Sequence, residues 1–286
     1  MELRCVAARQ GRLFSFLKGE LHMSSGLINR LKRTDAIRVD GVHRWMDFAV
    51  MPGNVITVAL EDERPQYPAQ QGPVSVVFED DFLLAVDKTA GMLIHPSHAQ
   101  NEGTLANFVA GYYAATAQKS AFHPMTRLDR DTFGIVLLAK NAHVHTLLQE
   151  TRVTKTYHAW VLGGPREDRG TIDAPIARLP LPSLLRHISP EGKPSLTEFR
   201  VLERRGEYSK LALTPVTGRT HQLRLHCLHR GFPILGDPQY CTEESRAVSE
   251  QLGLSHQLLC AKQLELTHPM TGQPLLLESR LDADLL

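Results

Sequence analysis

The chain has 286 residues, 42% of them hydrophobic and 22% charged, a balance typical of a soluble globular protein with enough apolar residues for a sizeable core. Its formal net charge of +1 excludes a histone-like polycation, so any nucleic-acid binding must come from locally clustered Lys and Arg. This length suits one large domain or two unequal ones.

The cysteines and the apolar runs bear on where the protein works. The four cysteines form no CxxC pair and no dense framework, which indicates a reducing intracellular compartment (Cys5, Cys227, Cys241 and Cys260). No apolar run approaches the ~20 residues that span a bilayer. The apolar patch at residues 13–17 is short and ends at Lys18, so it does not predict a signal peptide. We therefore expect a cytoplasmic protein without a membrane segment.

Residues 1–60 have the pattern of a small module of their own. Ser24 or Ser25 is a suitable N-cap for the second of two amphipathic helices, and Asp40-Gly41 favours a turn after the first of two strands. The apolar spacing predicts these helices and strands, in chain order, at residues 13–17, 27–31, 37–41 and 55–60.

This module is basic. It contains nine Lys and Arg residues against five Asp and Glu residues, a local excess of four positive charges. Arg30, Lys32 and Arg33 lie on and just after its second helix, where they form either an ordinary solvated face or a surface for phosphates. The order of helix, helix, strand, Asp-Gly turn and strand resembles the S-four type of RNA-binding domain, which implies that these three residues bind RNA.

Residues 61–73 contain three prolines and little to bury, which predicts an extended, solvated linker. The remainder, residues 74–286, has alternating strand and helix patterns. We expect helices at residues 104–118, 141–151 and 220–230, and a variable loop region at 164–194. Strands are expected at 74–79, 82–88, 135–139, 155–163, 195–203, 208–215, 258–267 and 274–281.

The stretch from Arg127 to Asp131 is the first candidate for chemistry. It places two carboxylates, Asp129 and Asp131, and two guanidiniums directly before an apolar run typical of a buried strand. Gly134, between loop and run, permits a backbone turn that a residue with a Cβ would resist. The loop is either a solvated polar loop or a catalytic one. If it is catalytic, one alternative is a hydrolase that uses both carboxylates as acid and base.

Two other segments invite a functional interpretation. Tyr157 lies on the same predicted strand face as Ala159 and Val161, where an aromatic residue is either core or part of a site. The three histidines of the 220–230 helix do not repeat on one helix face, and we expect no metal site there (His221, His226 and His229). Arg224 would lie in the first turns of that helix, near its positive end.

Five segments in order along residues 74–285 resemble the RluA-type pseudouridine synthases. They are Ala85-Val86-Asp87-Lys88 with Gly91 and His95-Pro96, Arg127-Leu128-Asp129, Lys155-Thr156-Tyr157, Thr217-Gly218-Arg219-Thr220-His221-Gln222-Leu223-Arg224, and Pro233-Ile234-Leu235-Gly236-Asp237. Two positions depart from the family pattern: Thr126 stands where His is usual, and Phe133 stands where Ser is usual. Both flank Asp129, so they bear on loop packing and substrate fit.

The resemblance implies an α+β catalytic domain with a mixed, largely antiparallel sheet, joined to the small N-terminal α/β RNA-binding module. It implies isomerisation of uridine in RNA without any cofactor. Asp129 would be the catalytic carboxylate, through either covalent addition or removal of a sugar proton. Arg224 would neutralise it, and Tyr157 would stack on the uracil and take part in proton transfer.

The resemblance also implies which residues hold the RNA. Arg127 would occupy the space left by the flipped uridine, and Arg219 and His221 would contact the RNA around it. Because of the N-terminal module, ribosomal RNA is the favoured substrate, with transfer RNA open, and a monomer is expected. The chief alternative is a non-catalytic RNA-binding or ribosome-assembly protein.

Overall fold

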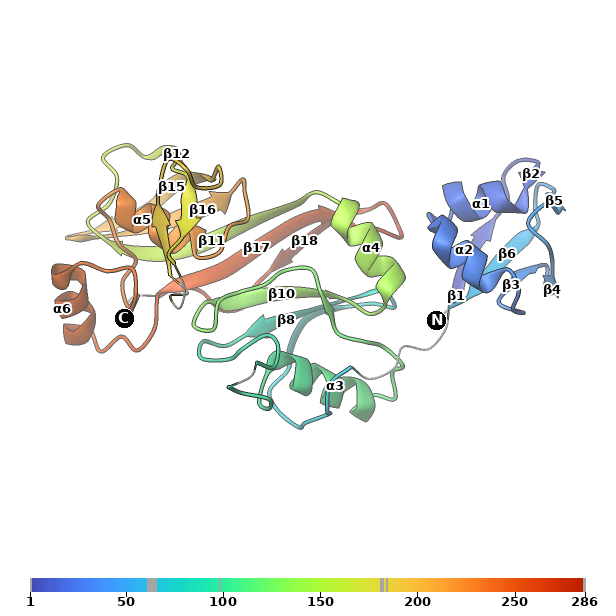
Figure 1. The fold of residues 1–286 in the computed structure, drawn as a ribbon, viewed down its shortest axis with the longest axis horizontal. Coiled ribbons are helices and arrows are strands. Elements are labelled where there is room, and N and C mark those ends of the chain that lie inside the picture. Colours follow the sequence, from blue (N-terminus) through green and yellow to red (C-terminus); the bar gives the residue numbers. More distant parts are fainter. Residues whose placement is uncertain (1, 61–65, 98, 181–182, 184, 285–286) are drawn as a thin grey trace.

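The structure, a computed structural model, describes residues 2–60, 66–97, 99–180, 183 and 185–284. Within these residues two main sheets divide the chain: a four-stranded sheet near the N-terminus and a ten-stranded sheet formed by the rest. Figure 1 shows the small sheet with its two helices at one end of the molecule and the large sheet extending across the other part.

The small sheet has the strand order β1-β6-β3-β4, and all of its pairings are antiparallel within the described residues. Its strands are β1 (Glu2–Val6), β3 (Ile37–Val39), β4 (Val42–His43) and β6 (Val55–Ala59), while β2 (Gly11–Arg12) pairs with β5 (Ala49–Val50). Helices α1 (Leu13–Gly19) and α2 (Ser25–Leu31) bury their apolar residues in one cluster with this sheet. The two predicted helices and two predicted strands are confirmed, and β1, β2, β4 and β5 are additional strands.

The N-cap predicted for α2 is also confirmed. The Ser24 hydroxyl accepts the N–H of Leu27 at 3.1 Å, which satisfies one of the free N–H groups of the first turn. Phe82 and Met270, from the part of the chain that forms the large sheet, pack partly against the apolar cluster of the N-terminal module.

Part of the predicted linker lies outside the described residues, namely 61–65, and the rest is largely exposed. This exposed part is nevertheless fastened to α3 (Leu105–Ala115). Gln70 donates its backbone N–H to the Asn107 carbonyl at 3.1 Å and accepts the Gly103 N–H on its side chain at 2.8 Å. The composition indicated solvent exposure but not these contacts.

The large sheet runs in the order β12-β15-β16-β11-β17-β10-β8-β7, with β9 beside β10 and β18 beside β17. In the described residues its pairings are antiparallel except that of β10 with β17, which is parallel. The predicted α+β fold with a mixed, largely antiparallel sheet is therefore confirmed. The strands are β7 (Ser75–Glu79), β8 (Leu83–Lys88), β9 (His123–Pro124), β10 (Phe133–Ala139), β11 (Val153–Leu162), β12 (Arg169–Asp173), β15 (Leu196–Arg205), β16 (Tyr208–Pro215), β17 (Leu259–Thr267) and β18 (Pro274–Glu278).

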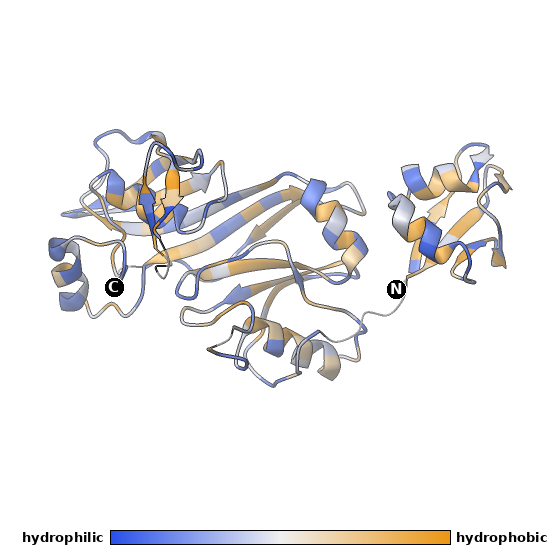
Figure 2. Ribbon diagram, viewed as in Figure 1, coloured by the Kyte–Doolittle hydropathy of each residue, from blue (hydrophilic) through white to orange (hydrophobic). Residues whose placement is uncertain are grey.

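The remaining elements are α4 (Ala142–Glu150), α5 (Gln222–His229) and α6 (Glu243–Gln251), with the pair β13 (Ile176–Arg178) and β14 (Arg186–Ile188). The prediction of a loop region at 164–194 is wrong, because β12, β13 and β14 lie within it. These strands are short, so their alternating pattern is too brief to stand out among Pro, Gly and Arg. Helix α6 was not predicted, and Figure 2 shows it as almost wholly hydrophilic.

Strand β10 lies inside the large sheet, between β17 and β8, and each of its seven residues is buried. Gly134 has φ of 103°, and a Cβ at that position would come within 2.4 Å of the Ala261 carbonyl oxygen on β17. The predicted need for glycine is therefore confirmed: only a residue without a side chain permits this close approach of the two strands.

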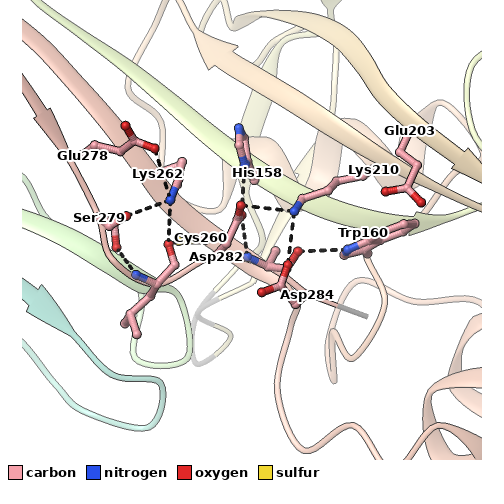
Figure 3. Close-up of polar contacts among 12 residues, drawn as sticks. His158, Trp160, Glu203, Lys210, Cys260, Lys262, Glu278, Ser279, Asp282 and Asp284 are labelled. Carbon is pink, nitrogen blue, oxygen red and sulfur yellow. Dashed lines mark hydrogen bonds and ion pairs between the residues drawn. The ribbon is translucent and has the colours of Figure 1, made fainter. Parts of the chain in front are cut away.

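Strand β11 has two differently packed faces. Tyr157, Ala159 and Val161 belong to the main apolar cluster, whereas Trp160 packs in a separate cluster on the other side. On that other side the C-terminal segment crosses the sheet, and Figure 3 shows its Asp282 among His158 and Lys210. The indole of Trp160 donates to the Ala283 carbonyl at 2.9 Å, which fastens this segment to the sheet.

Candidate active site

The loop that carries Asp129 is fixed at both of its ends. Before it, Thr126 is buried, and its hydroxyl accepts the N–H of Leu137 on β10 at 3.1 Å. After it, the Thr132 N–H donates to the Asp129 carbonyl at 3.2 Å, and the Thr132 hydroxyl accepts from the Gln257 side chain at 3.0 Å. Thr126 thus ties the start of the loop to β10, and Thr132 ties its end to Gln257, just before β17.

The two departures from the family pattern both have packing partners. Thr126 makes the hydrogen bond to β10 described above, and Phe133 packs in the apolar cluster with Trp160 and Leu235. The ring of Phe133 also meets that of His256 edge to face, with 5.7 Å between centroids. Neither side chain projects into the cavity described below, so the loop accommodates both residues within its packing.

Arg224 brings helix α5 to this loop, although the two residues are 95 positions apart in the chain. Its Nη1 donates to Asp129 Oδ2 at 3.0 Å. Its Nε and Nη2 donate to the two oxygens of Asp237 at 2.7 and 2.8 Å. The guanidinium therefore bridges two carboxylates, one of them by the paired geometry that only arginine offers.

Asp237 and Tyr240 form a support for Arg224 that sequence reasoning did not assign. Asp237 is buried, and its Oδ1 accepts the backbone N–H groups of Gln239 and Tyr240 at 2.9 Å each. The Arg224 guanidinium lies over the Tyr240 ring, 4.9 Å from its centroid. Asp237 ends the last recognised motif, so its position was visible, but its contact with Arg224 appears only in three dimensions.

His221 completes this group at the start of α5. It has the left-handed φ of 57°, and its Nδ1 lies 2.8 Å from the Tyr240 hydroxyl. Its Nε2 lies 3.8 Å from Asp129 Oδ2. Burial lowers the pKa of His221 and outweighs the opposing effect of Asp129, which favours a neutral imidazole at neutral pH.

Tyr157 projects from β11 into the same region and is buried. Burial raises the pKa of Tyr157, and the nearby negative charge of Asp129 raises it further. The phenol therefore keeps its proton at neutral pH. For Arg224, burial opposes the charged form, but the hydrogen bonds and the charges of Asp237 and Asp129 prevail and raise its pKa.

Lys88 joins two loops beneath the site. It is fully buried, and its ammonium donates to the backbone carbonyls of Thr89, Met92 and Arg130 at 3.0, 2.9 and 2.8 Å. Burial lowers the pKa of Lys88 to about 8, although Asp131 and Asp129 oppose that shift. Through the Arg130 carbonyl, Lys88 holds the residue that follows Asp129.

Several of the side chains at this site line one cavity of about 630 Å³. Asp129, Tyr157 and Arg224 all contribute to its wall, so the structure brings the three predicted catalytic residues together. The predicted RNA-binding residues Arg127, Arg219 and His221 line the same cavity, and both arginines are exposed.

The other predicted RNA-binding residues lie elsewhere. Arg30 and Arg33 are exposed and Lys32 is half-buried, at the end of α2 and just after it. Arg30 lines a second groove, also of about 630 Å³, between α2 and α4. The basic helix face and the cavity with Asp129 are therefore separate surfaces.

Asp131 does not belong to the cavity wall in the described structure, and its Oδ1 lies 3.9 Å from the Nε of Arg130. A carboxylate pair of Asp129 and Asp131 therefore does not face one substrate. Over the described residues no three His, Cys, Asp or Glu side chains converge on a point suited to a metal ion. Nor does that part of the chain contain a helix long and apolar enough to cross a membrane.

Residues 82–229, which carry Asp129, Tyr157 and Arg224, match the family model of RNA pseudouridylate synthases. The chain belongs to this family. It is 37% identical to an uncharacterized RNA pseudouridine synthase of Chloroflexus aurantiacus, over 96% of this chain and 87% of that protein. It is also 37% identical to ribosomal large subunit pseudouridine synthase D of Nitrosomonas europaea, over 81% of this chain and 69% of that protein.

A solved structure, human RNA pseudouridylate synthase domain containing 1, has a TM-score of 0.61 and 28% identity, over 76% of this chain and 86% of that one. The predicted RluA-type family is confirmed by the family model and the relatives. This protein is an RNA pseudouridine synthase, an isomerase, and the non-catalytic alternative is set aside.

Proposed function

We propose that this enzyme isomerises a uridine of large-subunit ribosomal RNA to pseudouridine, with Asp129 as the catalytic carboxylate. The observation that carries the proposal is the ion pair between Asp129 and Arg224 at the wall of a cavity that Tyr157 also lines. The choice of RNA follows the relatives that are named ribosomal large subunit pseudouridine synthase D. Residues 74–286 would form the catalytic domain, and residues 1–60 an RNA-binding module joined to it by residues 61–73.

The reaction needs a carboxylate beside the ribose. The bond from the sugar C1′ to uracil N1 breaks, the base rotates while bound, and C5 bonds to C1′ in its place. Asp129 serves either by adding to the sugar or by removing a sugar proton, and both routes need its charged form. Burial of a carboxylate disfavours that form, and the hydrogen bond from Arg224 offsets this cost and fixes the direction of Oδ2.

Tyr157 would form the surface against which the detached uracil turns. Its ring offers an apolar face at the cavity wall. Because its pKa is raised by burial, the phenol does not act as a ready phenolate base. Its hydroxyl instead relays the proton that leaves C5, accepting that proton while it donates its own toward N1 of the uracil, which has been freed from the sugar and carries a hydrogen in the product.

The arginines would bind and hold the flipped nucleotide. A base inside a duplex is out of reach, so the uridine must leave its stack at a cost of a few kcal/mol. Arg127, exposed at the cavity rim two residues before Asp129, would fill the vacated space. Arg219 and His221 would contact the RNA around the cavity, while Arg30, Lys32 and Arg33 would bind phosphates farther away.

The test is Asp129→Asn, with Asp131→Asn as the matched control in the same loop. The first variant keeps the size of the side chain but loses its charge, so pseudouridine formation should fall by at least about a thousandfold while RNA binding survives. The control changes the neighbouring carboxylate outside the cavity and should retain most activity. Mass spectrometry of pseudouridine in large-subunit ribosomal RNA measures both, and substantial turnover by Asp129→Asn would remove Asp129 from its role.

The same assay separates the choice of RNA from the chemistry. Wild-type enzyme should modify ribosomal RNA transcripts and leave transfer RNA transcripts unchanged. Modification of transfer RNA alone would overturn the proposed target and leave the role of Asp129 intact.

A further inference from the structure

The N-terminal module exposes a tryptophan that the site described above does not use. Trp45 follows strand β4, and 61% of its surface is exposed. The other tryptophan of the chain, Trp160, is 1% exposed. An aromatic side chain of this size is usually buried to a large extent, so its exposure leaves a flat ring available to a ligand.

Contacts on both sides hold Trp45 in place. The His43 ring meets its ring edge to face, with 5.6 Å between centroids. The Trp45 carbonyl accepts the Phe48 N–H at 2.9 Å, and the Phe48 carbonyl in turn accepts the N–H of Leu13, the first residue of α1. The indole is therefore presented from a backbone turn tied to the module's helix.

The surroundings of Trp45 are basic as well as aromatic. The Arg44 guanidinium lies over the Phe48 ring, 4.7 Å from its centroid. On the neighbouring strand Arg38 stands opposite His43 and is ion-paired with Asp35. The module carries an excess of four positive charges, and because the whole chain carries +1, the rest of it carries −3.

We propose that Trp45 is a stacking platform for an unpaired base of the substrate RNA, with the net positive charge of the module attracting the phosphates. Aromatic rings bind single-stranded RNA in this way because every base has a flat π-face. The proposal rests on the RNA substrate of the proposed function and adds a second contact to it. This contact lies on β4 and the turn after it, apart from Arg30, Lys32 and Arg33 on the helix side of the module.

RNA fits this surface better than an apolar protein partner does. A protein partner would need an apolar patch free of charge, whereas Trp45 lies between His43 and Arg44 on one side and Asp47 on the other. The positive charge of the module complements phosphate, and the exposed Trp45 ring offers a flat face for one base. Protein binding is therefore an alternative outcome of the test.

The experiment follows tryptophan fluorescence of the full chain during titration with a single-stranded RNA of mixed sequence, and with heparin, which carries charge but no bases. RNA should quench the exposed indole and heparin should not. In Trp45→Phe the quenching should disappear, because only the buried Trp160 remains. Equal quenching by heparin, or unchanged quenching in Trp45→Phe, would overturn the proposal.

Affinity gives the second measurement. Trp45→Ala should weaken RNA binding by about tenfold, the loss expected for one stacked base, while Trp45→Phe keeps most of the affinity. Leu276→Ala is the matched control, since Leu276 is also 61% exposed but lies on β18. An unchanged RNA affinity in Trp45→Ala would overturn the proposal. If that variant kept its RNA affinity but lost the binding of a protein, Trp45 would be a protein-binding residue instead.

Turnover separates this inference from the proposed function. Trp45→Ala should raise KM for the RNA and leave kcat at saturating RNA unchanged, because Trp45 does not line the cavity with Asp129. Absence of pseudouridine formation by the wild type would contradict the proposed function, whereas quenching of Trp45 by RNA would still be measurable. A fall in kcat with unchanged RNA affinity would contradict the role of Trp45.

Discussion

The two faces of strand β11 carry two ion-pair clusters that differ in how completely they are buried. On the side of Tyr157, Arg224 bridges Asp129 and Asp237, and the side chains of Arg224 and Asp237 are 5% and 0% exposed. On the other side, His158 and Lys210 bind Asp282, at 2.9 and 3.2 Å (Figure 3). Each cluster joins residues far apart in the sequence, and the first contributes Asp129 and Arg224 to the cavity wall.

The two clusters also differ in how far their carboxylates are neutralised by the neighbouring cations. One guanidinium faces two carboxylates in the first cluster, and Asp237 already satisfies it with two hydrogen bonds, so the negative charge of Asp129 is not fully cancelled. In the second cluster Lys210 also faces two carboxylates, Asp282 and Asp284, but the Asp284 side chain is 74% exposed to solvent, and the result is a fastened C-terminal segment. An excess charge held at a cavity wall costs stability, which indicates that it is kept for function.

Among the variants that test this comparison, Asp237→Asn should lose the most stability and the most activity. Arg224 would lose its fully buried partner, and removal of one member of a buried pair costs about 3 kcal/mol or more. Arg224 would then turn toward Asp129, so kcat should fall by roughly a hundredfold, the order seen for loss of a group that orients a reacting residue. Urea unfolding and pseudouridine assays measure the two losses.

Asp284→Asn is the control for Asp237→Asn, because Asp284 is 74% exposed and lies 3.4 Å from Lys210 in the other cluster. It should change neither quantity by a measurable amount. Full activity and full stability of Asp237→Asn would show that Asp237 is dispensable. The deeper burial of the Arg224–Asp237 pair would then have no consequence for the protein.

Lys88→Met should have the next largest effect. The methionine fills similar space but leaves the carbonyls of Thr89, Met92 and Arg130 without their donor, a loss of about 2–4 kcal/mol in unfolding free energy. The loop after Asp129 should loosen, and kcat should fall by roughly tenfold. Urea unfolding and single-turnover assays measure these changes.

The difference in unfolding free energy between the wild type and Lys88→Met should change with pH, and the direction of that change follows from the pKa of Lys88. Burial lowers the pKa of Lys88 to about 8 from 10.5, so between these two values the unfolded chain binds more protons than the folded one. The stability of the wild type relative to Lys88→Met should therefore rise as the pH increases from about 8 to 10.5. A relative stability that falls over this window would mean that the ammonium is not desolvated in the folded protein.

The sequence was sufficient to predict that three particular residues face one cavity. Asp129, Tyr157 and Arg224 lie in motifs that keep their order, and the apolar run behind Asp129 predicted the strand that anchors the loop. Gly134 was predicted for its backbone freedom, and its φ of 103° confirms this. Each of these features depends on residues close together in the sequence, so a local sequence pattern is enough to predict it.

The parts that escaped prediction depend on contacts between distant segments. Helix α6 is hydrophilic, and its two fully buried residues, Ser245 and Ser249, give no apolar periodicity to detect. The role of Asp237 depends on Arg224 in the preceding helix, and the sequence shows only a Gly-Asp turn. Burial of a polar side chain is decided by what packs over it, which a local pattern does not show.

Asp282→Asn should have the smallest effect and tests whether the second cluster is merely structural. Burial works to raise the pKa of Asp282, but the hydrogen bonds and charges of His158 and Lys210 prevail and lower it from 3.8. The folded state therefore holds this carboxylate in its charged form, and the stabilisation is present above the unfolded pKa and is lost as the pH falls through the folded value. At pH 7 the variant should lose about 0.5–1 kcal/mol of unfolding free energy, the usual range for a partly exposed pair.

Urea unfolding at pH 7 and near pH 3 measures this difference, which should shrink at the lower pH as the wild-type carboxylate takes up its proton. Turnover at saturating RNA should not change, since Asp282 lies on the face of β11 opposite Tyr157. A fall in kcat comparable to that of Asp237→Asn would show that strand β11 transmits the state of one cluster to the other. The C-terminal segment would then help to position Tyr157 rather than only fasten the sheet.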